Sequence, residues 1–437
     1  TTALIADQHD HLDIGTEFSL VDAEVNVSTG DLVIDLEDGS GNAHTLTVED
    51  FQTDALDSIR VDYGTGMTPE DGVLDVYTVA SGTEAPSDDN TIVFGTTETD
   101  QVKGGAGDDL ILGGGGDDTI IGGAGNDSIR GGQGNDILRG GKGNDRLEGG
   151  AGIDVADFSD ATAAVSVDLT TGIGSGADIG TDVFANTENI LGGAGDDTLT
   201  GDTANNYLAG NDGADIIDGS AGIDTLDGGK GADTIDGGTG ADTIHGGDDA
   251  DVLTGNVGSD TITGGAGSDV ATFAGNQSDY TFESSADGLT VTVTHVSSGD
   301  ADTVKEVETL RFDDGDIGVS HDGNTMVLSG TDAITDDIKV VGTVPVTVAG
   351  GAKADTITGG DGADTLSGDA GSDVIVGGLG SDVAKFAGKQ SDYTFESSSD
   401  GLTVTVTHVD EGYADTVTEV ETLSFDDGDI GVSYDGN

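Results

Sequence analysis

Single apolar residues recur every nine positions along much of the chain, each framed by polar residues and followed by glycine. The frame G-G-x-G-x-D-x-U-x, in which U is apolar, fits six consecutive units from Gly104, nine from Gly192 and four from Gly350. Across these 19 units, position one is always Gly, position six is Asp in 18, and position eight is Ile or Leu in 16. A fixed period this short indicates a solenoid, in which each unit supplies one small structural element.

The composition of one unit predicts a turn followed by a very short strand. Gly tolerates positive φ, so the first six residues can form a tight turn. The last three residues suffice for a short strand whose middle side chain points inward. Two units then make one coil of a flattened helix, so residues two units apart stack on each other and the Ile and Leu side chains form an inner ladder.

The last unit of each block departs from the pattern. These units read DVADF, DVATF and DVAKF, with Ala at position eight and with Phe158, Phe273 and Phe386 where the next Gly is expected. A stacked array cannot leave its last layer open to water, and solenoids close with atypical terminal units. We therefore interpret the three Phe residues as caps of the apolar ladder.

Outside the repeats the pattern is that of ordinary strands, and helix signals are nearly absent. Residues 264–324 and 377–437 align without a gap and differ at ten of 61 positions. Apolar and Thr residues alternate over residues 289–295, which is typical of a half-buried strand. The predicted segments are an N-terminal β module (1–94), a first repeat block (95–158), a linker or strand module (159–191), a second repeat block (192–273), one copy of a β module (274–340), a third repeat block (341–386) and a second copy of that module (387–437).

The charge is extreme for a folded protein. The chain of 437 residues has 86 acidic and 13 basic residues, a net charge of -73, which argues against nucleic acid and anionic lipid as partners. High net charge with few aromatic residues is also the signature of disorder. However, 34% of the residues are apolar and they recur at fixed spacing, which favours a fold whose charge is balanced by bound cations.

Several classes of protein are excluded or left open by simple counts. There is no cysteine, so disulfides, thiolate nucleophiles and thiolate zinc ligands are excluded. No apolar run approaches the ~18 residues of a membrane span, so we expect no membrane insertion. The N-terminus lacks Met and a signal-like segment, so either it has been processed or the sequence is part of a longer polypeptide.

Stacking of the repeats brings acidic side chains together. Parallel layers lie about 4.8 Å apart, so Asp109 comes close to Asp127, and Asp118 to Asp136. Two carboxylates at such a distance repel by roughly 1 kcal/mol in water, and by more where water is excluded. A divalent cation between them reverses the sign of this term. Glycine-rich turns also expose backbone carbonyls, and such irregular oxygen sets suit Ca²⁺ better than Mg²⁺.

These units resemble the RTX, or haemolysin-type, calcium-binding repeat proteins. The resemblance implies an all-β fold of calcium-binding parallel β-roll blocks interleaved with small antiparallel β modules. It also implies that the Asp residues at position six are calcium ligands and that the turn glycines offer carbonyl oxygens. Asn206, Asp249 and Lys353 depart from the motif, and we expect weak or missing sites beside residues 201–209. The predicted metal ligands are Asp109, Asp118, Asp127, Asp136, Asp145, Asp154, Asp197, Asp215, Asp224, Asp233, Asp242, Asp251, Asp260, Asp269, Asp355, Asp364, Asp373 and Asp382.

Other interpretations of the acidic and histidine residues are weaker. The Gly-Asp phrase could be turn punctuation without metal, but ordinary turns do not need so many Asp residues in one phase. The phrase FDDGDIG, at residues 312–318 and 425–431, is either a further cation site or an exposed acidic turn. His9 and His11 could bind a transition metal, although a frayed terminus explains them better. None of the motifs H-E-x-x-H, G-x-S-x-G or G-x-x-x-x-G-K-[ST] occurs, so we expect no enzyme activity.

Two functions are compatible with this pattern. The first is a secreted structural protein of the cell surface or extracellular matrix of a Gram-negative bacterium: a layer, filament or adhesin that folds on calcium and self-associates. The alternative is the non-catalytic RTX portion of a secreted enzyme, such as a protease or polysaccharide epimerase. The resemblance implies type I secretion in either case. A catalytic domain upstream of Thr1 in the parent gene would favour the alternative.

Overall fold

The structure, a computed structural model, describes residues 91–433 except 332 and 400, together with the backbone of six strands before residue 91. Two compact units are present, of which the first comprises residues 1–202 and 206–211, and the second residues 203–205 and 212–437. The all-β prediction is confirmed, because the helical segments of residues 91–433 are two 3-10 turns, η2 (Gln277–Asp279) and η3 (Gln390–Asp392). No helix among the described residues has the length and apolar character needed to cross a membrane.

The early strands include a small meander. The strands β2, β3 and β4 pair in antiparallel order. β5 and β6 form a second antiparallel pair, and β6 also pairs in parallel with β7 (Thr91–Phe94). Of the predicted 1–94 module, the structure describes residues 91–94 and, before them, only the backbone of six strands. The side chain of His11 and all of His9 therefore lie outside the described part of the chain. The early strands are β1 (His11–Asp13), β2 (Phe18–Asn26), β3 (Asp31–Asp38), β4 (Ala43–Val48), β5 (Ile59–Asp62) and β6 (Val73–Thr78).

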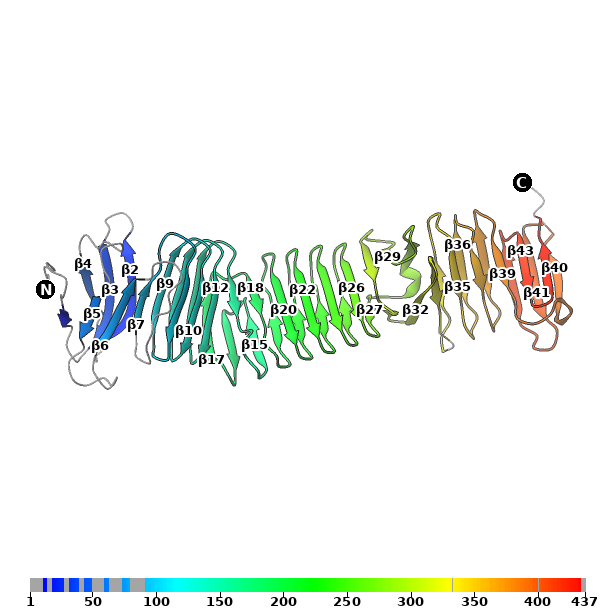
Figure 1. Ribbon diagram of the computed structural model, residues 1–437. Coiled ribbons are helices and arrows are strands. Elements are labelled where there is room, and N and C mark those ends of the chain that lie inside the picture. Colours follow the sequence, from blue (N-terminus) through cyan, green and yellow to red (C-terminus); the bar gives the residue numbers. More distant parts are fainter. Residues whose placement is uncertain are drawn as a thin grey trace. The chain divides into compact units, whose positions relative to one another are not determined.

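The first repeat block forms a roll of two parallel columns of strands (Figure 1). One column runs β8–β10–β12–β14 and the other β7–β9–β11–β13. Partners in each column lie two repeat units apart in sequence, as in Ile120 with Leu138 and Ile129 with Leu147, which confirms two units per coil. The strands are β8 (Gln101–Gly105), β9 (Leu110–Gly115), β10 (Thr119–Ala124), β11 (Ser128–Gln133), β12 (Ile137–Lys142), β13 (Arg146–Ala151) and β14 (Val155–Asp157).

Residues 159–191 extend this roll. The strand β17 pairs in parallel with β13, and β18 pairs in parallel with β14, so both columns continue through the predicted linker. Before β17 in the chain, β15 and β16 form an antiparallel hairpin. In this hairpin β16 pairs antiparallel with β17, and β15 pairs in parallel with β19. The strands of this insertion and its continuation are β15 (Val165–Asp168), β16 (Ile173–Gly176), β17 (Gly180–Ala185), β18 (Asn189–Leu191), β19 (Thr198–Thr200) and β20 (Tyr207–Asp212).

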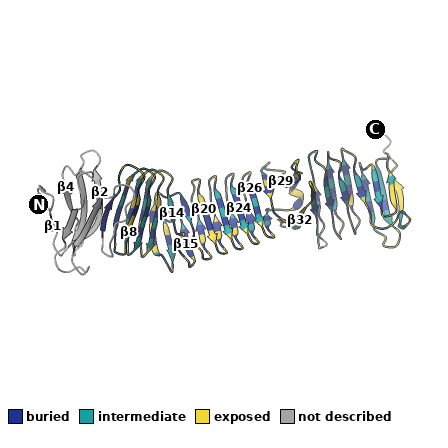
Figure 2. Ribbon diagram, viewed as in Figure 1, coloured by how far each residue is buried: buried dark blue, intermediate teal, exposed yellow. Residues whose placement is uncertain are grey.

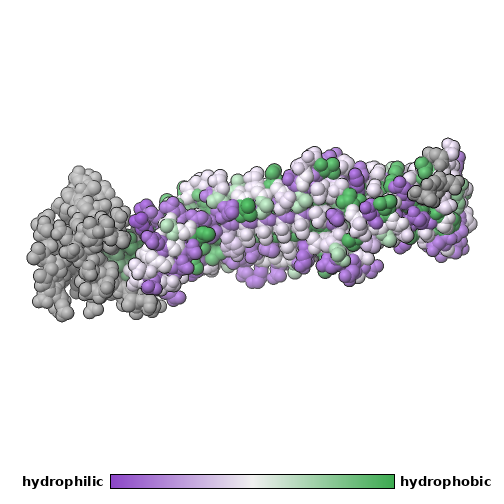
Figure 3. Space-filling view, turned by 90° about the horizontal axis from the view of Figure 1, so that it is seen from above, coloured by the Kyte–Doolittle hydropathy of each residue, from purple (hydrophilic) through white to green (hydrophobic). Residues whose placement is uncertain are grey.

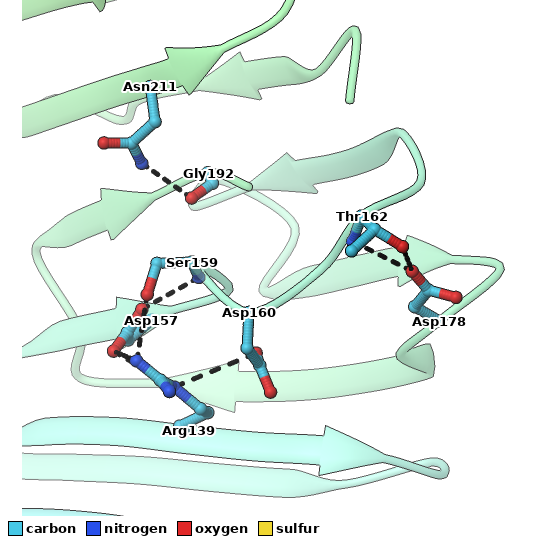
Figure 4. A network of polar contacts seen from close by, with 8 residues as sticks. All are labelled: Arg139, Asp157, Ser159, Asp160, Thr162, Asp178, Gly192 and Asn211. Atoms are coloured by element: carbon cyan, nitrogen blue, oxygen red, sulfur yellow. Dashed lines mark hydrogen bonds and ion pairs between the residues drawn. The ribbon is translucent and has the colours of Figure 1, made fainter. Parts of the chain in front are cut away.

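A polar cluster fastens the start of the insertion to the roll (Figure 4). Arg139 on β12 forms an ion pair with Asp157 on β14, and its Nη2 also donates to the Ser159 hydroxyl at 2.9 Å. Farther along, the Asp178 carboxylate accepts hydrogen bonds from the Thr162 backbone N–H at 2.9 Å and from its hydroxyl at 2.7 Å. Asp157 is the buried last residue of the final repeat unit, and Arg139 therefore links the end of the first block to Ser159, the first residue of the insertion.

The second unit also contains a two-column roll, which is followed along the chain by a β module. The columns are β21–β23–β25–β27 and β22–β24–β26, with partners again two repeat units apart in sequence. The first module then adds β31 in parallel to β27 and β30 in parallel to β26. In the same module β29 pairs antiparallel with β30, and β28 pairs antiparallel with β29. The strands are β21 (Ile216–Asp218), β22 (Thr225–Lys230), β23 (Thr234–Asp236), β24 (Thr243–Asp248), β25 (Val252–Thr254), β26 (Thr261–Ala266), β27 (Val270–Thr272), β28 (Tyr280–Ser284), β29 (Thr290–His295), β30 (Ala301–Lys305) and β31 (Thr309–Phe312).

A third roll and a second module complete this unit. The strands β33–β35–β37–β39 and β34–β36–β38 form the columns, and β43 and β42 of the second module extend them. The strands are β32 (Gly315–Asp322), β33 (Thr325–Ser329), β34 (Asp337–Lys339), β35 (Val346–Ala349), β36 (Thr356–Gly360), β37 (Thr365–Ser367), β38 (Val374–Gly378), β39 (Val383–Lys385), β40 (Tyr393–Ser397), β41 (Thr403–His408), β42 (Ala414–Thr418), β43 (Thr422–Phe425) and β44 (Gly428–Gly431).

The core of each roll is a ladder of single apolar side chains. Every Ile or Leu at position eight is at most 1% exposed, whereas most of the residues on either side of it are partly or fully exposed (Figure 2). Full burial of such a side chain contributes about 1.5–3 kcal/mol relative to exposure. One inward residue per strand therefore forms the whole apolar interior, which leaves a thin core that depends on every layer.

The prediction that Phe158, Phe273 and Phe386 cap the ladder is wrong. The ladder passes the Ala residues beside them, because Ala156 pairs with Ile190, Ala271 with Leu310, and Ala384 with Leu423. The Phe rings instead hold the inserted modules. Phe273, for example, stacks on Phe312 of β31 with ring centroids 5.4 Å apart. The atypical units therefore mark junctions with modules that continue the roll.

Candidate metal centres

The Asp residues at position six lie inside the turns of the rolls. All of the predicted ligand residues are at most 2% exposed, although each carries a carboxylate. Each Asp directly precedes the short strand that bears the inward Ile, Leu or Ala, so the ladder fixes its position. A carboxylate withdrawn from water this far needs hydrogen bonds or a cation, because transfer of an unpaired charge into a protein interior is very costly.

One oxygen of each carboxylate stitches neighbouring layers together. Asp127 Oδ1 accepts a hydrogen bond from the backbone N–H of Asp109 at 2.8 Å, and the Asp127 N–H donates to Asp145 Oδ1 at 2.8 Å. The second column repeats this pattern, with Asp136 Oδ1 accepting from the Asp118 N–H at 2.8 Å. The sequence predicted that these carboxylates stack, and the structure adds that each is held by the backbone of the layer before it.

The other oxygen has no such bond. In most of the predicted residues, Oδ2 is buried and has no hydrogen-bond partner within the described part of the chain. Asp197 differs, because its Oδ1 accepts from the Val165 N–H at 2.8 Å and its Oδ2 from the Gly193 N–H at 2.7 Å. The predicted residues with such an unbonded Oδ2 are Asp109, Asp118, Asp127, Asp136, Asp145, Asp154, Asp233, Asp242, Asp251, Asp260, Asp269, Asp355, Asp364, Asp373 and Asp382.

The glycine at position one shows what surrounds this oxygen. A Cβ added to Gly104 would lie 2.3 Å from Asp109 Oδ2 and 2.7 Å from the carbonyl oxygen of Gly122 in the next layer. At Gly228 the same atom would meet Asp233 Oδ2 at 2.3 Å and the Gly246 carbonyl oxygen at 2.5 Å. A carboxylate oxygen and a backbone carbonyl therefore converge on a space that any side chain would fill, which explains the invariant glycine.

This donor set fits calcium. Carboxylate and carbonyl oxygens are the hard ligands that Ca²⁺ accepts in irregular coordination. Among the described residues there is no group of three or more His, Cys, Asp or Glu side chains that could hold a metal. Any cation at the turns would therefore be bound by one or two carboxylates together with backbone carbonyls, which is the arrangement that the converging atoms offer.

Burial also raises the pKa of these carboxyl groups. The pKa of Asp127 is raised from 3.8 to about 8, chiefly by burial and further by the charges of Asp109 and Asp145, against the hydrogen bond from the Asp109 N–H. For the same main reason the pKa of Asp118 is raised to about 7 and that of Asp233 to about 7. Without a cation, the folded roll thus favours protonated carboxyl groups near neutral pH.

We expect the calcium-free protein to be more stable at mildly acidic pH than at pH 8. A group with a folded pKa of about 8 and an unfolded pKa of 3.8 stabilises the fold fully below pH 3.8, and this contribution is lost as the pH rises to about 8. Thermal melting in calcium-free buffer should give a clearly higher Tm at about pH 5.5 than at about pH 8. With calcium the order should reverse, because protons compete with the metal. A calcium-free Tm that is equal or higher at pH 8 would contradict this expectation.

The structure also reveals acidic residues that the motif search missed. Asp100 and Asp182 each have one buried oxygen without a hydrogen-bond partner among the described residues. Asp182 Oδ1 accepts from the Asp145 N–H at 2.8 Å, and in the first module Asp302 Oδ1 accepts from the Asp260 N–H at 2.8 Å. Asp415 does the same for Asp373 at 2.9 Å in the second module. The columns of carboxylates thus continue through the inserted modules.

At the three junctions between a repeat block and the following inserted segment, a glutamate takes the place of the Asp in the column. Glu188 Oε2 accepts from the Asp154 N–H at 2.8 Å, Glu308 Oε2 from the Asp269 N–H at 2.9 Å, and Glu421 Oε2 from the Asp382 N–H at 2.8 Å. A signal for these residues was present in the sequence. They occur in E-N-I, E-T-L and E-T-L, an acidic residue two positions before an inward apolar residue, without the glycines of the full motif.

Residues that depart from the motif behave differently. The Asn206 side chain donates from Nδ2 to the Glu188 carbonyl at 2.7 Å and accepts at Oδ1 from the Asp202 N–H at 2.8 Å. Its amide group is thus engaged with the chain itself, and the expected weak site there stays a prediction. The acidic FDDGDIG turns also have a local role, since Asp314 Oδ1 accepts from the Gln277 N–H at 2.9 Å.

Comparison with known proteins adds independent information. Residues 94–156, 191–271 and 349–384 match the RTX calcium-binding nonapeptide repeat in several overlapping copies. Among solved structures, the chain is similar to the extracellular lipase LipA from Serratia marcescens, with 20% sequence identity and a TM-score of 0.16. That alignment covers 50% of this chain and 38% of the lipase chain, so the chain spans well under half of that protein. No curated protein matches the chain.

Proposed function

Because the chain belongs to the RTX calcium-binding repeat proteins, we propose that it is a secreted, non-catalytic structural protein that folds when its rolls bind calcium. The observation that carries this proposal is the row of buried carboxylate oxygens that face backbone carbonyls in the turns. The row also includes Asp182, which lies in the insertion after the first repeat block.

The residues that would hold calcium are the predicted Asp residues with an unbonded Oδ2, with Asp100 and Asp182, together with carbonyls of the position-one glycines. The bound cation would supply positive charge where adjacent carboxylates otherwise repel and where burial raises their pKa. The chain's own contribution is to hold each Oδ1 on a backbone N–H, so that Oδ2 is left to point at the neighbouring carbonyl.

The proposed location is the outside of a Gram-negative bacterium, at the cell surface or in the matrix. Extracellular calcium is millimolar, which suits modules with Kd values of roughly 10⁻⁴–10⁻³ M. At the much lower calcium of the cytosol such sites would stay unfilled, so the chain would be exported unfolded, in keeping with the type I route. The face seen in Figure 3 is mainly hydrophilic with scattered apolar residues, as expected of a protein exposed to water.

Calcium-dependent self-association is the expected behaviour of a layer or filament protein. Chains of charge -73 repel each other, and bound calcium lowers this repulsion. Light scattering during a calcium titration, followed by electron microscopy, should therefore show folding first and then filaments or sheets. A protein that folds completely yet remains monomeric at high concentration would contradict the structural role, and would favour the alternative of a non-catalytic portion of a secreted enzyme.

A further inference from the structure

The two β modules provide an internal comparison, because nearly the same sequence occurs in two environments. Residues 264–324 and 377–437 differ at ten of 61 positions and align at a constant offset. In both modules one end joins the preceding roll through parallel strand pairs. The opposite face is covered in the first module and open in the second, and the equivalent residues can be compared one by one.

In the first module, the opening layer of the third roll covers this face along two lines. Along one line, β33 pairs antiparallel with β32, which brings Leu328 opposite Val319. Along the other, Val340 forms a bridge to Phe282, and the Val341 N–H donates to the Phe282 carbonyl at 2.8 Å. As a result, Phe282 is 0% exposed.

Two further contacts make this covering specific. Gln277 is 0% exposed, donates from Nε2 to Asp336 Oδ1 at 2.9 Å and accepts at Oε1 from the Asp337 N–H at 3.0 Å. Ile334 lies directly on Gly315, since a Cβ at that glycine would come within 1.8 Å of the Ile334 Cδ1 atom. The segment from Thr325 to Val341 therefore contacts the module in three ways: by strand pairing with β32, by hydrogen bonds to the Gln277 amide and by the packing of Ile334 on Gly315.

The second module presents the same groups without this layer. Phe395, the counterpart of Phe282, is 42% exposed, and Ile430 is partly exposed where Ile317 is fully buried. The Gln390 amide donates instead to the Gly428 carbonyl at 3.0 Å, and among the described residues no apolar side chain lies on Gly428 as Ile334 lies on Gly315. Figure 2 shows exposed residues gathered on the strands near the C-terminus.

These exposed groups line a cavity with an unused strand edge beside it. The cavity has a volume of about 610 Å³ and is lined by two glycines, four serines and the apolar residues Phe395, Val404, Leu423, Ile430 and Val432. Within the described residues β44 pairs with β43 alone, whereas its counterpart β32 also pairs with β33. A cavity with an apolar wall next to a free edge is the arrangement that accepts an added strand, in which backbone bonds give affinity and pockets give specificity.

We propose that this face of the second module binds the opening layer of a β-roll, a segment of the same type as residues 325–341. Its strand would add to β44 as β33 adds to β32, and its Ile-x-Asp-Asp turn would meet Gly428 and Gln390. Its counterpart of Val340 would form the bridge to Phe395. The inference rests on the duplicated modules and is independent of the proposed structural role. The same module thus acts as a general acceptor of roll layers.

A labelled peptide of residues 323–343 tests the proposal with the full chain in millimolar calcium. Fluorescence anisotropy should show saturable binding at one peptide per chain. Phe395→Ser should weaken binding by about tenfold or more. The matched control Val409→Ser changes a residue that is 58% exposed outside the cavity, and should bind like the parent. Circular dichroism confirms that each variant is folded. Equal binding by both variants, or none by the folded parent, would overturn the proposal.

A second variant removes the dependence on peptide affinity. Asn437 aligns with Asn324, so residues 325–350 can be appended directly after Asn437 to repeat the first arrangement in cis. Hydrogen exchange should then show new protection of the β44 amides, and unchanged exchange there would refute the proposal.

If the parent chain self-associates, dissociation of the complex by the peptide would support the site and identify a second copy as the source of the layer. Self-association that the peptide does not affect would place the contact elsewhere and count against it.

Discussion

Removal of calcium at about pH 8 is expected to unfold the rolls of both units. Each layer stacks buried carboxylates on those of the next, and a pair at 4 Å repels by roughly 1 kcal/mol in water and about 4 kcal/mol near a protein surface. Most of the predicted Asp residues have a buried oxygen without a hydrogen-bond partner among the described residues. The repulsion between stacked carboxylates therefore recurs from layer to layer along every roll. One calcium ion at a hundred times its Kd contributes about 2.7 kcal/mol per site.

Circular dichroism and thermal melting with calcium, with a chelator and with magnesium would measure this effect. The β signal and the cooperative transition should be present with calcium, absent with the chelator and poorly restored by magnesium, because Mg²⁺ demands near-octahedral geometry. A spectrum and Tm unchanged by the chelator would show that the turns do not depend on a metal.

A single ligand can be tested within the same experiment. Asp127 bonds both stacked neighbours, Asp109 and Asp145, so Asp127→Asn should remove about two calcium ions from the stoichiometry measured by isothermal titration. Asp322→Asn, at an exposed position on β32, is the matched control and should leave the stoichiometry at the parent value. Equal stoichiometry for both variants would rule out sharing of Asp127 between layers.

Ile235→Asp is expected to be the most damaging single substitution in the second roll. Ile235 is 0% exposed and stacks between Ile217 and Leu253. The change loses about 1.5–3 kcal/mol of apolar burial. It also places a polar group in the ladder at a cost of roughly 2–7 kcal/mol, even if the group becomes protonated. The sum is comparable with the whole stability of an ordinary domain, which is about 5–15 kcal/mol.

Ile216→Asp provides the control, because Ile216 is adjacent to the ladder residue Ile217 on β21 but is 55% exposed. Its cost should stay within about 0.5 kcal/mol, as for most surface substitutions. Hydrogen exchange in millimolar calcium should show loss of protection along β23 and its neighbours for Ile235→Asp alone. Similar exchange patterns in the two variants would mean that the ladder does not hold the roll together.

The sequence by itself determined the roll. Each nine-residue unit carries its own turn glycines, its buried Asp and its inward Ile or Leu, so the pairing of Ile120 with Leu138, two units later, followed from the period alone. Such predictions succeed because every unit has the same neighbours, and local spacing therefore contains the tertiary contact. The stacking of Asp109 on Asp127 was predictable for the same reason.

Only the tertiary structure decided what happens where the period stops. Asp182, Asp302 and Glu308 join the carboxylate columns through partners 37, 42 and 39 residues away in sequence. These separations differ from the 18-residue spacing of stacked repeats, so the repeat period does not predict them. The three Phe residues do not close the ladder but lie where an inserted segment begins. Each inserted segment adds one strand to each of the two columns, so the roll continues beyond the Phe. Phe282 and Phe395 have the same neighbours in sequence, yet one is covered by residues beyond its own module and the other is open. Burial of this kind depends on which distant segment returns to a face, and spacing within a module carries no information about that segment.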